Sequence, residues 1–215
     1  MNPKRTLFWS VFLIVLALIV WGLAAAIQKA PANAPGLPTG TPAPVSASDH
    51  VTGPADAPVT LIEYSDFQCP ACEAYYPLVT QVLASSTVPI RFVYRHFPLS
   101  QHPNAIPASL ASEAAAKQGK FWQMYDQLFI NHADWTELPD PTQVFAGYAA
   151  KIGLDTARFA TDVKDPALMS KINADQDDGT TIGLQGTPTF FVNGKAIANP
   201  RSYEAFTAII DAAAR

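Results

Sequence analysis

Hydrophobic residues follow three different patterns along this chain. An unbroken apolar run extends from Leu7 to Ile27, and a stretch rich in Pro, Ala, Gly and Thr follows over residues 28–50. Short apolar segments with strand or helix periodicity fill residues 51–215. The first pattern is typical of a membrane helix, the second of an extended linker and the third of one folded domain. We therefore predict a short N-terminus at residues 1–6, a transmembrane segment, a linker and a domain.

The apolar run predicts both a membrane anchor and its orientation. At about 1.5 Å per residue, residues 7–27 span roughly 30 Å, the hydrocarbon thickness of a bilayer. Lys4 and Arg5 precede the run and only Lys29 follows closely, which favours a cytoplasmic N-terminus and an extracytoplasmic domain. The run exceeds the usual signal-peptide core of about 7–15 residues, which favours a retained signal anchor. The small residues Ala24–Ala26 leave a cleaved signal peptide as the alternative.

Within residues 51–215, strand and helix patterns alternate in a defined order. Residues 59–64 and 90–94 are rich in β-branched and aromatic residues and predict two strands around a helix. Residues 187–197 predict a hairpin, because Asn193-Gly194 lies between two strand-like segments. The remaining segments have helical character: 73–83, 106–118, 120–130, 143–152, 156–163, 165–178 and 202–214.

The order β, α, β, helical block, β, β, α predicts an α/β domain. A β-α-β unit followed by a hairpin and a helix implies one central sheet with mixed strand directions. The helical block, at about residues 102–180, is expected to be an insertion into this core.

Composition narrows the class of protein. Hydrophobic residues make up 49% and charged residues 15% of the chain, which excludes a charged disordered segment. The net charge of −4 argues against nucleic acid as the main partner. With 2 cysteines, the chain holds neither a multi-disulfide scaffold nor a four-cysteine metal site.

Both cysteines lie in one tetrapeptide, Cys69-Pro70-Ala71-Cys72, at the predicted junction of a strand and a helix. Pro70 suits the first helical turn, where its missing N–H costs nothing. Free N–H groups and the helix dipole at this end favour a Cys69 thiolate and lower its pKa. Cys72 lies within one turn and can attack a mixed disulfide at Cys69. These residues predict thiol–disulfide exchange, and Ala71 adds nothing to thiolate stabilisation.

Two other interpretations of the tetrapeptide are less favoured. A structural disulfide closing so short a loop removes little chain entropy. A zinc site needs two further ligands, for which His96 and His102 are the nearest candidates. We therefore expect no bound metal.

Two segments around the cysteines contain residues suited to assist them. Glu63, on an otherwise apolar strand, would have a raised pKa if buried and could accept the Cys72 proton. The alternative is an edge-strand glutamate that faces water. Asp66 is interpreted as a solvated loop acid. Pro188 begins a strand, where a cis bond would expose the Thr187 backbone to an extended substrate; from the residues alone, cis and trans are equally compatible.

The remaining polar residues are given ordinary structural roles. His50 falls in the predicted linker. The other three histidines, His96, His102 and His132, are scattered along the sequence, so polar or capping roles are expected for these three. The pair Asp177-Asp178 is expected at a solvated helix end.

The chain resembles DsbA-type proteins of the thioredoxin fold over about residues 50–214. Three groups of motifs in the right order carry this resemblance: Phe67–Cys72 after the strand bearing Glu63; Arg95–Leu99 with His102-Pro103 and Gln118–Trp122; and Gly186–Gly194.

The resemblance implies a thioredoxin core with a helical insertion, an exported location and a dithiol–disulfide reaction. It implies Cys69 as nucleophile, Cys72 as resolving thiol, Glu63 as buried acid, and Pro188 as a cis-proline preceded by Thr187. Ala71 departs from the best-known member, which has histidine there, and this departure leaves the oxidising strength open.

The sequence therefore predicts a membrane-anchored domain that acts as an extracytoplasmic thiol:disulfide oxidoreductase. It is expected to be a monomer that oxidises exported proteins with thiols, needs no organic cofactor, and is reoxidised by a quinone-linked membrane partner. The alternatives are a membrane-tethered reductase for cytochrome or copper-site assembly, or a non-enzymatic metal-binding or chaperone module.

Overall fold

The computed structural model describes Trp9 and residues 36–215. The predicted N-terminus at 1–6, nearly all of the transmembrane segment at 7–27 and the start of the linker lie outside the described residues. No helix within the described part is long and apolar enough to cross a membrane. Residues 37–215 form one compact unit, described here by itself.

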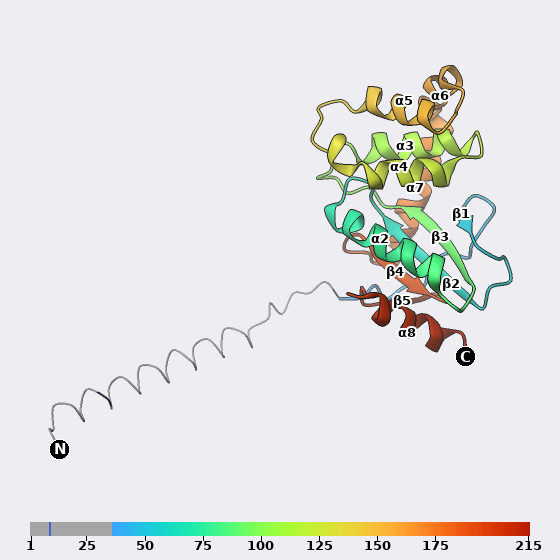
Figure 1. The fold of residues 1–215 in the computed structure, drawn as a ribbon, viewed down its shortest axis with the longest axis vertical. Helices are drawn as coiled ribbons and strands as arrows, with labels where there is room; N and C mark the ends of the chain where they lie inside the picture. Colours follow the sequence, from blue (N-terminus) through green and yellow to red (C-terminus); the bar gives the residue numbers. More distant parts are fainter. Residues whose placement is uncertain (1–8, 10–35) are drawn as a thin grey trace. The chain divides into compact units, whose positions relative to one another are not determined.

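A five-stranded sheet forms the centre of this unit (Figure 1), and it has the mixed strand directions that the sequence predicts. The strand order is β1-β3-β2-β4-β5, with β2 and β3 parallel and all other neighbours antiparallel. The strands are β1 (His50–Thr52), β2 (Val59–Ser65), β3 (Ile90–His96), β4 (Thr189–Val192) and β5 (Lys195–Ile197). The apolar strand that bears Glu63 is therefore central and buried along its length.

Apolar side chains alternate across the sheet and divide its core into two layers. On one face, Leu61, Phe92 and Phe190 pack against helices α2 (Pro70–Ser85) and α8 (Tyr203–Ala213). On the other face, residues such as Ile62, Val93 and Phe191 pack against the end of α7 and the loop after it. Successive side chains of a strand point to opposite faces of the sheet, and both faces are covered here, so the strands are apolar on both sides.

Between β3 and β4 the chain forms the helical block expected from the sequence (Figure 1). Its helices are α3 (Ala105–Ala116), α4 (Phe121–Ile130), the 3₁₀ turn η1 (His132–Asp134), α5 (Thr142–Lys151), α6 (Thr156–Asp162) and α7 (Pro166–Thr181). A second apolar core fills this block and continues to the two cysteines, with Trp135 and Met124 fully buried. The insertion thus shares its core with the end of the sheet that carries the tetrapeptide.

The predicted boundary between linker and domain at residue 50 is placed too late. Residues 37–50, called here the N-terminal arm, belong to the compact unit. The Gly40 N–H donates to the Ile182 carbonyl at 3.2 Å, and His50 begins β1, a strand that the sequence did not predict. The Pro-rich composition of the arm gives it no core of its own, so only its contacts with the folded domain hold it in place.

Arg95 is the centre of those contacts. Its Nε donates to Asp49 Oδ1 at 2.9 Å, its Nη1 to Asp178 Oδ2 at 2.8 Å, and its Nη2 to the Ala43 carbonyl at 2.9 Å. The Tyr64 hydroxyl also donates to Asp178. Asp178 is therefore an ion-pair partner, which corrects the expectation of a solvated helix end.

Candidate active site

The two cysteines lie where the sequence places them, at the start of α2. Cys69 is the N-cap residue, Pro70 occupies the first turn, and both cysteines are free thiols. The Cys69 residue is 6% exposed and Cys72 1% exposed. The backbone N–H of Cys69 donates to the Asp66 carbonyl at 3.1 Å, which fixes the turn from β2 into the helix. This turn aims unpaired helical N–H groups at the Cys69 sulfur.

The two thiols have opposite acidities. A hydrogen bond from the Cys72 thiol, aided by the Thr187 side chain and the backbone N–H groups of Cys72 and Ala71, lowers the Cys69 pKa to about 5, against the opposing effect of burial. Burial, together with the adjacent Cys69 sulfur, raises the Cys72 pKa well above its ordinary value. The arrangement therefore stabilises one thiolate, on Cys69, and keeps Cys72 protonated.

The Thr187–Pro188 peptide bond is cis and lies beside Cys69. The Cys69 Sγ is 3.6 Å from the Thr187 carbonyl oxygen. Among the described residues, the buried Thr187 Oγ1 has no other hydrogen-bond partner, so it can donate to the Cys69 thiolate. Residues separated by more than a hundred positions thus meet at the sulfur, as the resemblance implied for Thr187 and Pro188.

Glu63 lies on β2, the strand that leads to the cysteines, and is 2% exposed. Its strand, β2, is paired on both sides, so the alternative of an edge glutamate facing water is wrong. Burial raises the Glu63 pKa to about 7, and the Ser65 hydroxyl opposes this rise. The Glu63 charge in turn contributes to the raised pKa of Cys72. A carboxyl group with this pKa can exchange a proton with Cys72 near neutral pH.

Replacement of Glu63 by Gln should remove a pH-dependent loss of stability. Because the folded-state pKa is raised from 4.5 to about 7, the stability that protonated Glu63 provides is complete below pH 4.5 and is lost as pH rises through about 7. The free energy of unfolding of Glu63→Gln should therefore exceed that of wild type by up to about 3 kcal/mol above pH 7 and be nearly the same at pH 4.

Urea unfolding of the reduced protein at several pH values measures this difference. Glu73→Gln, at an exposed position of α2, is the matched control and should show no such pH dependence. An equal effect of the two substitutions at all pH values would contradict the role of burial at Glu63. We also expect Glu63→Gln to slow the step in which Cys72 gains or loses its proton.

Asp66 is buried, which corrects the expectation of a solvated loop acid. It is 1% exposed; its Oδ2 accepts from the Leu99 N–H at 2.9 Å and contacts His102 Nδ1 at 2.6 Å. Its own N–H faces the Cys72 Sγ at 3.5 Å. Asp66 therefore fixes the loop before the cysteines, and His102 is a partner of this carboxylate. The sequence did not reveal this because Leu99 and His102 reach Asp66 only through the fold.

A groove of about 550 Å³ begins next to Cys69 on the side of the insertion. His132 Nε2 contacts the Gln68 carbonyl at 3.1 Å, and Gln68 Nε2 donates to the Thr136 carbonyl at 2.7 Å. Ten residues line the groove: Gln68, Pro70, Gln101, His102, Pro103, His132, Thr136, Glu137, Leu138 and Pro139. No local sequence pattern indicates this groove, because it combines residues that precede α3 in the chain with residues that follow α4.

Comparison with known sequences gives one family match. A thioredoxin family model matches residues 46–212. The chain is 42% identical over 163 residues to a protein of Salinispora tropica named Na(+)/H(+) antiporter NhaA 3, covering 75% of this chain and 24% of that protein. It is 35% identical over 207 residues to a protein of Herminiimonas arsenicoxydans named Na(+)/H(+) antiporter NhaA, covering 95% of this chain and 32% of that protein. The chain thus spans about a quarter to a third of the length of these relatives.

Solved structures share the fold. BdbD from Bacillus subtilis matches with a TM-score of 0.72 and 24% identity, over 83% of this chain and 98% of that one. Alpha-DsbA1 from Wolbachia pipientis matches with a TM-score of 0.70 and 22% identity, over 79% and 92%. At these identities, both likenesses show a shared fold.

Proposed function

Because the chain belongs to the thioredoxin family, we propose that it is a thiol:disulfide oxidoreductase that oxidises exported proteins through a Cys69–Cys72 disulfide. The observation that carries this proposal is the opposed acidity of the two thiols beside the cis Pro188. A thiolate with a low pKa is a good leaving group, so a mixed disulfide at Cys69 is readily resolved. The same stabilised thiolate lowers the free energy of the reduced enzyme relative to the disulfide form. A disulfide with such a reduced form is an oxidant.

The reaction consists of two exchanges that move two electrons to the enzyme. A substrate thiolate attacks the Cys69 Sγ of the disulfide, the Sγ–Sγ bond breaks, and Cys72 leaves and takes up a proton. Glu63, whose pKa burial raises to about 7, would supply that proton. A second substrate thiolate then attacks the substrate sulfur of the mixed disulfide and releases Cys69 as the thiolate. The substrate gains a disulfide and the enzyme is left as a dithiol.

The Thr187-Pro188 segment is proposed to hold the substrate during this exchange. Its backbone lies against Cys69, where an extended peptide can pair with it by main-chain hydrogen bonds. Such pairing is independent of side chains and suits an enzyme that acts on many exported proteins.

The cellular setting is also part of the proposal. The apolar run at residues 7–27 supports a single-pass anchor with the catalytic domain outside the cytoplasm, and a monomer is expected there. A quinone-linked membrane protein would accept the two electrons and restore the disulfide. No organic cofactor is required for the exchange, because the dithiol itself carries the electrons.

The Cys72→Ser variant of the full-length chain tests the proposed activity. Without the resolving thiol, mixed disulfides between Cys69 and substrates should accumulate in the cell as high-mass species that a reductant dissolves. The matched control is the double variant Cys69→Ser/Cys72→Ser, which should trap nothing. Adducts that form equally in the double variant, or none in either, would refute the exchange activity.

The direction of the reaction is tested by the redox state and the reduction potential of the wild-type pair. An oxidase should be oxidised at rest in its own cells, with a potential nearer about −120 mV than about −270 mV. A fully reduced resting state with a potential near the lower value would identify a reductase instead.

A further inference from the structure

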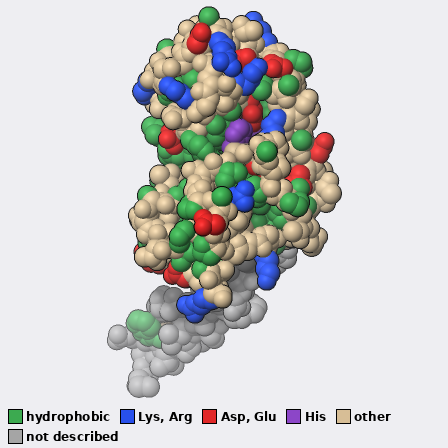
Figure 2. Space-filling view, turned by 90° about the vertical axis from the view of Figure 1, so that its right-hand side faces the viewer, with side chains coloured by type: hydrophobic (Ala, Val, Ile, Leu, Met, Phe, Trp, Pro, Cys, Tyr) green, Lys and Arg blue, Asp and Glu red, His purple; other side chains and the backbone are tan. Residues whose placement is uncertain are grey.

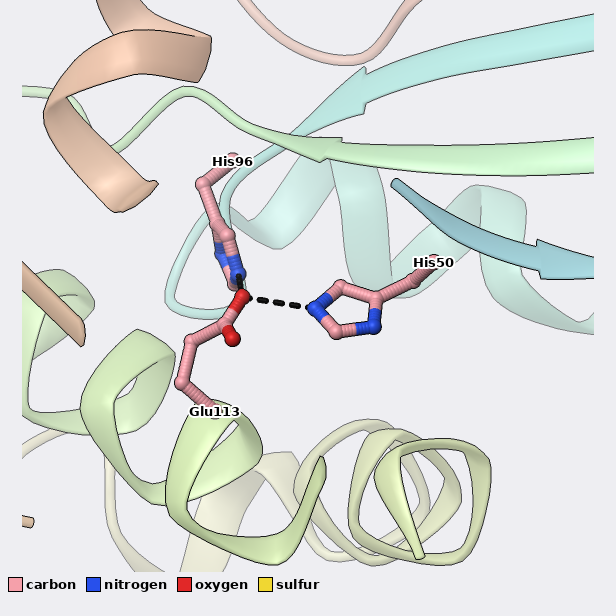
Figure 3. A group of neighbouring side chains, drawn as sticks. All are labelled: His50, His96 and Glu113. Carbon is pink, nitrogen blue, oxygen red and sulfur yellow. Dashed lines mark hydrogen bonds and ion pairs between the residues drawn. The ribbon is translucent and has the colours of Figure 1, made fainter. Parts of the chain in front are cut away.

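Three side chains far from one another in sequence converge on a single point of the domain (Figure 3). They are His50 of β1, His96 at the end of β3, and Glu113 of α3 in the insertion. Glu113 Oε1 lies 2.6 Å from His50 Nε2 and 2.8 Å from His96 Nε2. All three potential ligand atoms lie within 4.8 Å of one another. The sequence analysis assigned the two histidines separate, unremarkable roles.

The surroundings of this cluster are apolar and aromatic. His96 is fully buried and Glu113 is 5% exposed. The Phe121 ring stacks on His50 with centroids 3.5 Å apart, and the Tyr94 ring meets His96 edge-on at 5.3 Å. Among the described residues, Glu113 forms ion pairs with these two histidines and with no lysine or arginine. Among the described residues, the ion-pair partners of this buried carboxylate are therefore side chains that can also bind metals.

The donor atoms of the cluster already face one another, and a metal would displace the Nε2 protons that the imidazoles donate to Glu113. Both imidazoles direct the Nε2 atom toward the shared oxygen, and Nε2 is a common metal-binding atom of histidine. The side chain of His50 is 14% exposed, which leaves an entry path from solvent. Figure 2 shows histidine atoms within a recess on the face that it presents.

We propose that His50, His96 and Glu113 bind a divalent transition-metal ion, with zinc favoured by the two imidazoles and one carboxylate. Three protein ligands of this kind leave the fourth tetrahedral position for water. Zinc bonds of about 2.0–2.1 Å place neighbouring ligand atoms roughly 3.3 Å apart. The contacts of 2.6 and 2.8 Å to Glu113 must therefore open by roughly 0.5–0.7 Å. A small side-chain adjustment accomplishes this.

The site would join three parts of the domain. His50 follows the N-terminal arm, His96 ends a central strand, and Glu113 belongs to the insertion, so a bound ion would cross-link all three. His96 Nδ1 has no hydrogen-bond partner among the described residues, and its ring proton would lie there when Nε2 binds the ion. We therefore expect weaker affinity than in closed four-ligand zinc sites, whose histidines are held by such partners.

Zinc titration of the oxidised full-length chain tests this site. With Cys69 and Cys72 joined in a disulfide, the thiolates cannot bind zinc, and one equivalent should still bind. The His50→Ala variant should bind at least about 100-fold more weakly, because losing a ligand exceeds the 10–100-fold cost of losing an outer partner. The matched control, His132→Ala, should bind as wild type does. Cobalt(II) in place of zinc should show the visible bands of a four-coordinate nitrogen–oxygen site.

Three outcomes would overturn the site: no zinc bound by the oxidised protein, binding that disappears when the cysteines are oxidised, or unchanged binding in His50→Ala. Glu113→Gln provides a second test and should weaken binding similarly while leaving the circular dichroism spectrum unchanged. If that buried substitution prevents folding, the partly exposed His50 variant decides the matter alone. None of these results depends on the proposed exchange activity.

Discussion

In the reduced protein, Cys69 is expected to titrate with a pKa of about 5 instead of its ordinary value of 9.0. The difference of about four pH units means that the ratio of thiolate to thiol is raised roughly 10⁴-fold. The hydrogen bond from Cys72 is the largest cause, followed among the favourable ones by the Thr187 side chain. The ultraviolet absorbance of the thiolate and the rate of alkylation by iodoacetamide, both followed against pH, measure this value.

The Cys72→Ala variant is the sharpest control for that titration. It removes the main hydrogen-bond donor, so the Cys69 pKa should rise toward its ordinary value. A wild-type midpoint near 8 or 9, or a midpoint that Cys72→Ala leaves unchanged, would contradict the assignment.

The same shift has a consequence for stability that differs between the reduced and oxidised proteins. The folded-state pKa of Cys69 is depressed, so the thiolate contributes stability that is complete above the unfolded-state pKa near 9. This contribution is lost as pH falls from there to about 5. The disulfide form has no such group. The unfolding free energy of the reduced protein should therefore fall, relative to the oxidised protein, as pH is lowered from 9 to 5.

Replacement of Arg95 by Met should lower the free energy of unfolding by about 3–5 kcal/mol, the usual effect of removing one member of a buried ion pair. The side chains of Arg95 and Asp49 are 4% and 3% exposed, so the variant leaves a buried carboxylate without its partner. Asp178 loses its cation as well, and the arm loses the bond to the Ala43 carbonyl. The measurement is urea unfolding of the variant and wild-type chains.

Arg158→Met is the matched control for this prediction. Its side chain is 54% exposed and pairs with Asp162 at 3.3 Å, so the substitution should cost about 1 kcal/mol or less. If the two arginine variants lost similar stability, the buried network would not be what holds the arm. Arg95→Lys keeps the positive charge but loses the planar guanidinium with its several N–H donors, so its loss of unfolding free energy should be intermediate.

Local patterns predicted the elements well because their signals lie within a few residues. The Asn193-Gly194 turn lies between β4 and β5, with Asn193 at a φ of 48° and Gly194 at 78°, which are the angles that tight hairpins need. The apolar segments of β2 and β3 gave both strands to within two residues of their ends. The short strand β1 was missed because three residues carry too little signal, and it exists only through pairing with β3.

The sequence alone determined the reactive pair, because cysteine chemistry, the following proline and the strand-to-helix junction are all contained in one short segment. It also determined the mixed sheet, through the order of strand and helix patterns. Only the tertiary structure decided that Asp66 is buried against His102, that Asp178 pairs with Arg95, that residues 37–50 belong to the domain, and that His50, His96 and Glu113 meet. The physical reason is that burial and partnership of polar side chains arise from contacts between segments 17 to 135 positions apart, which no local pattern records.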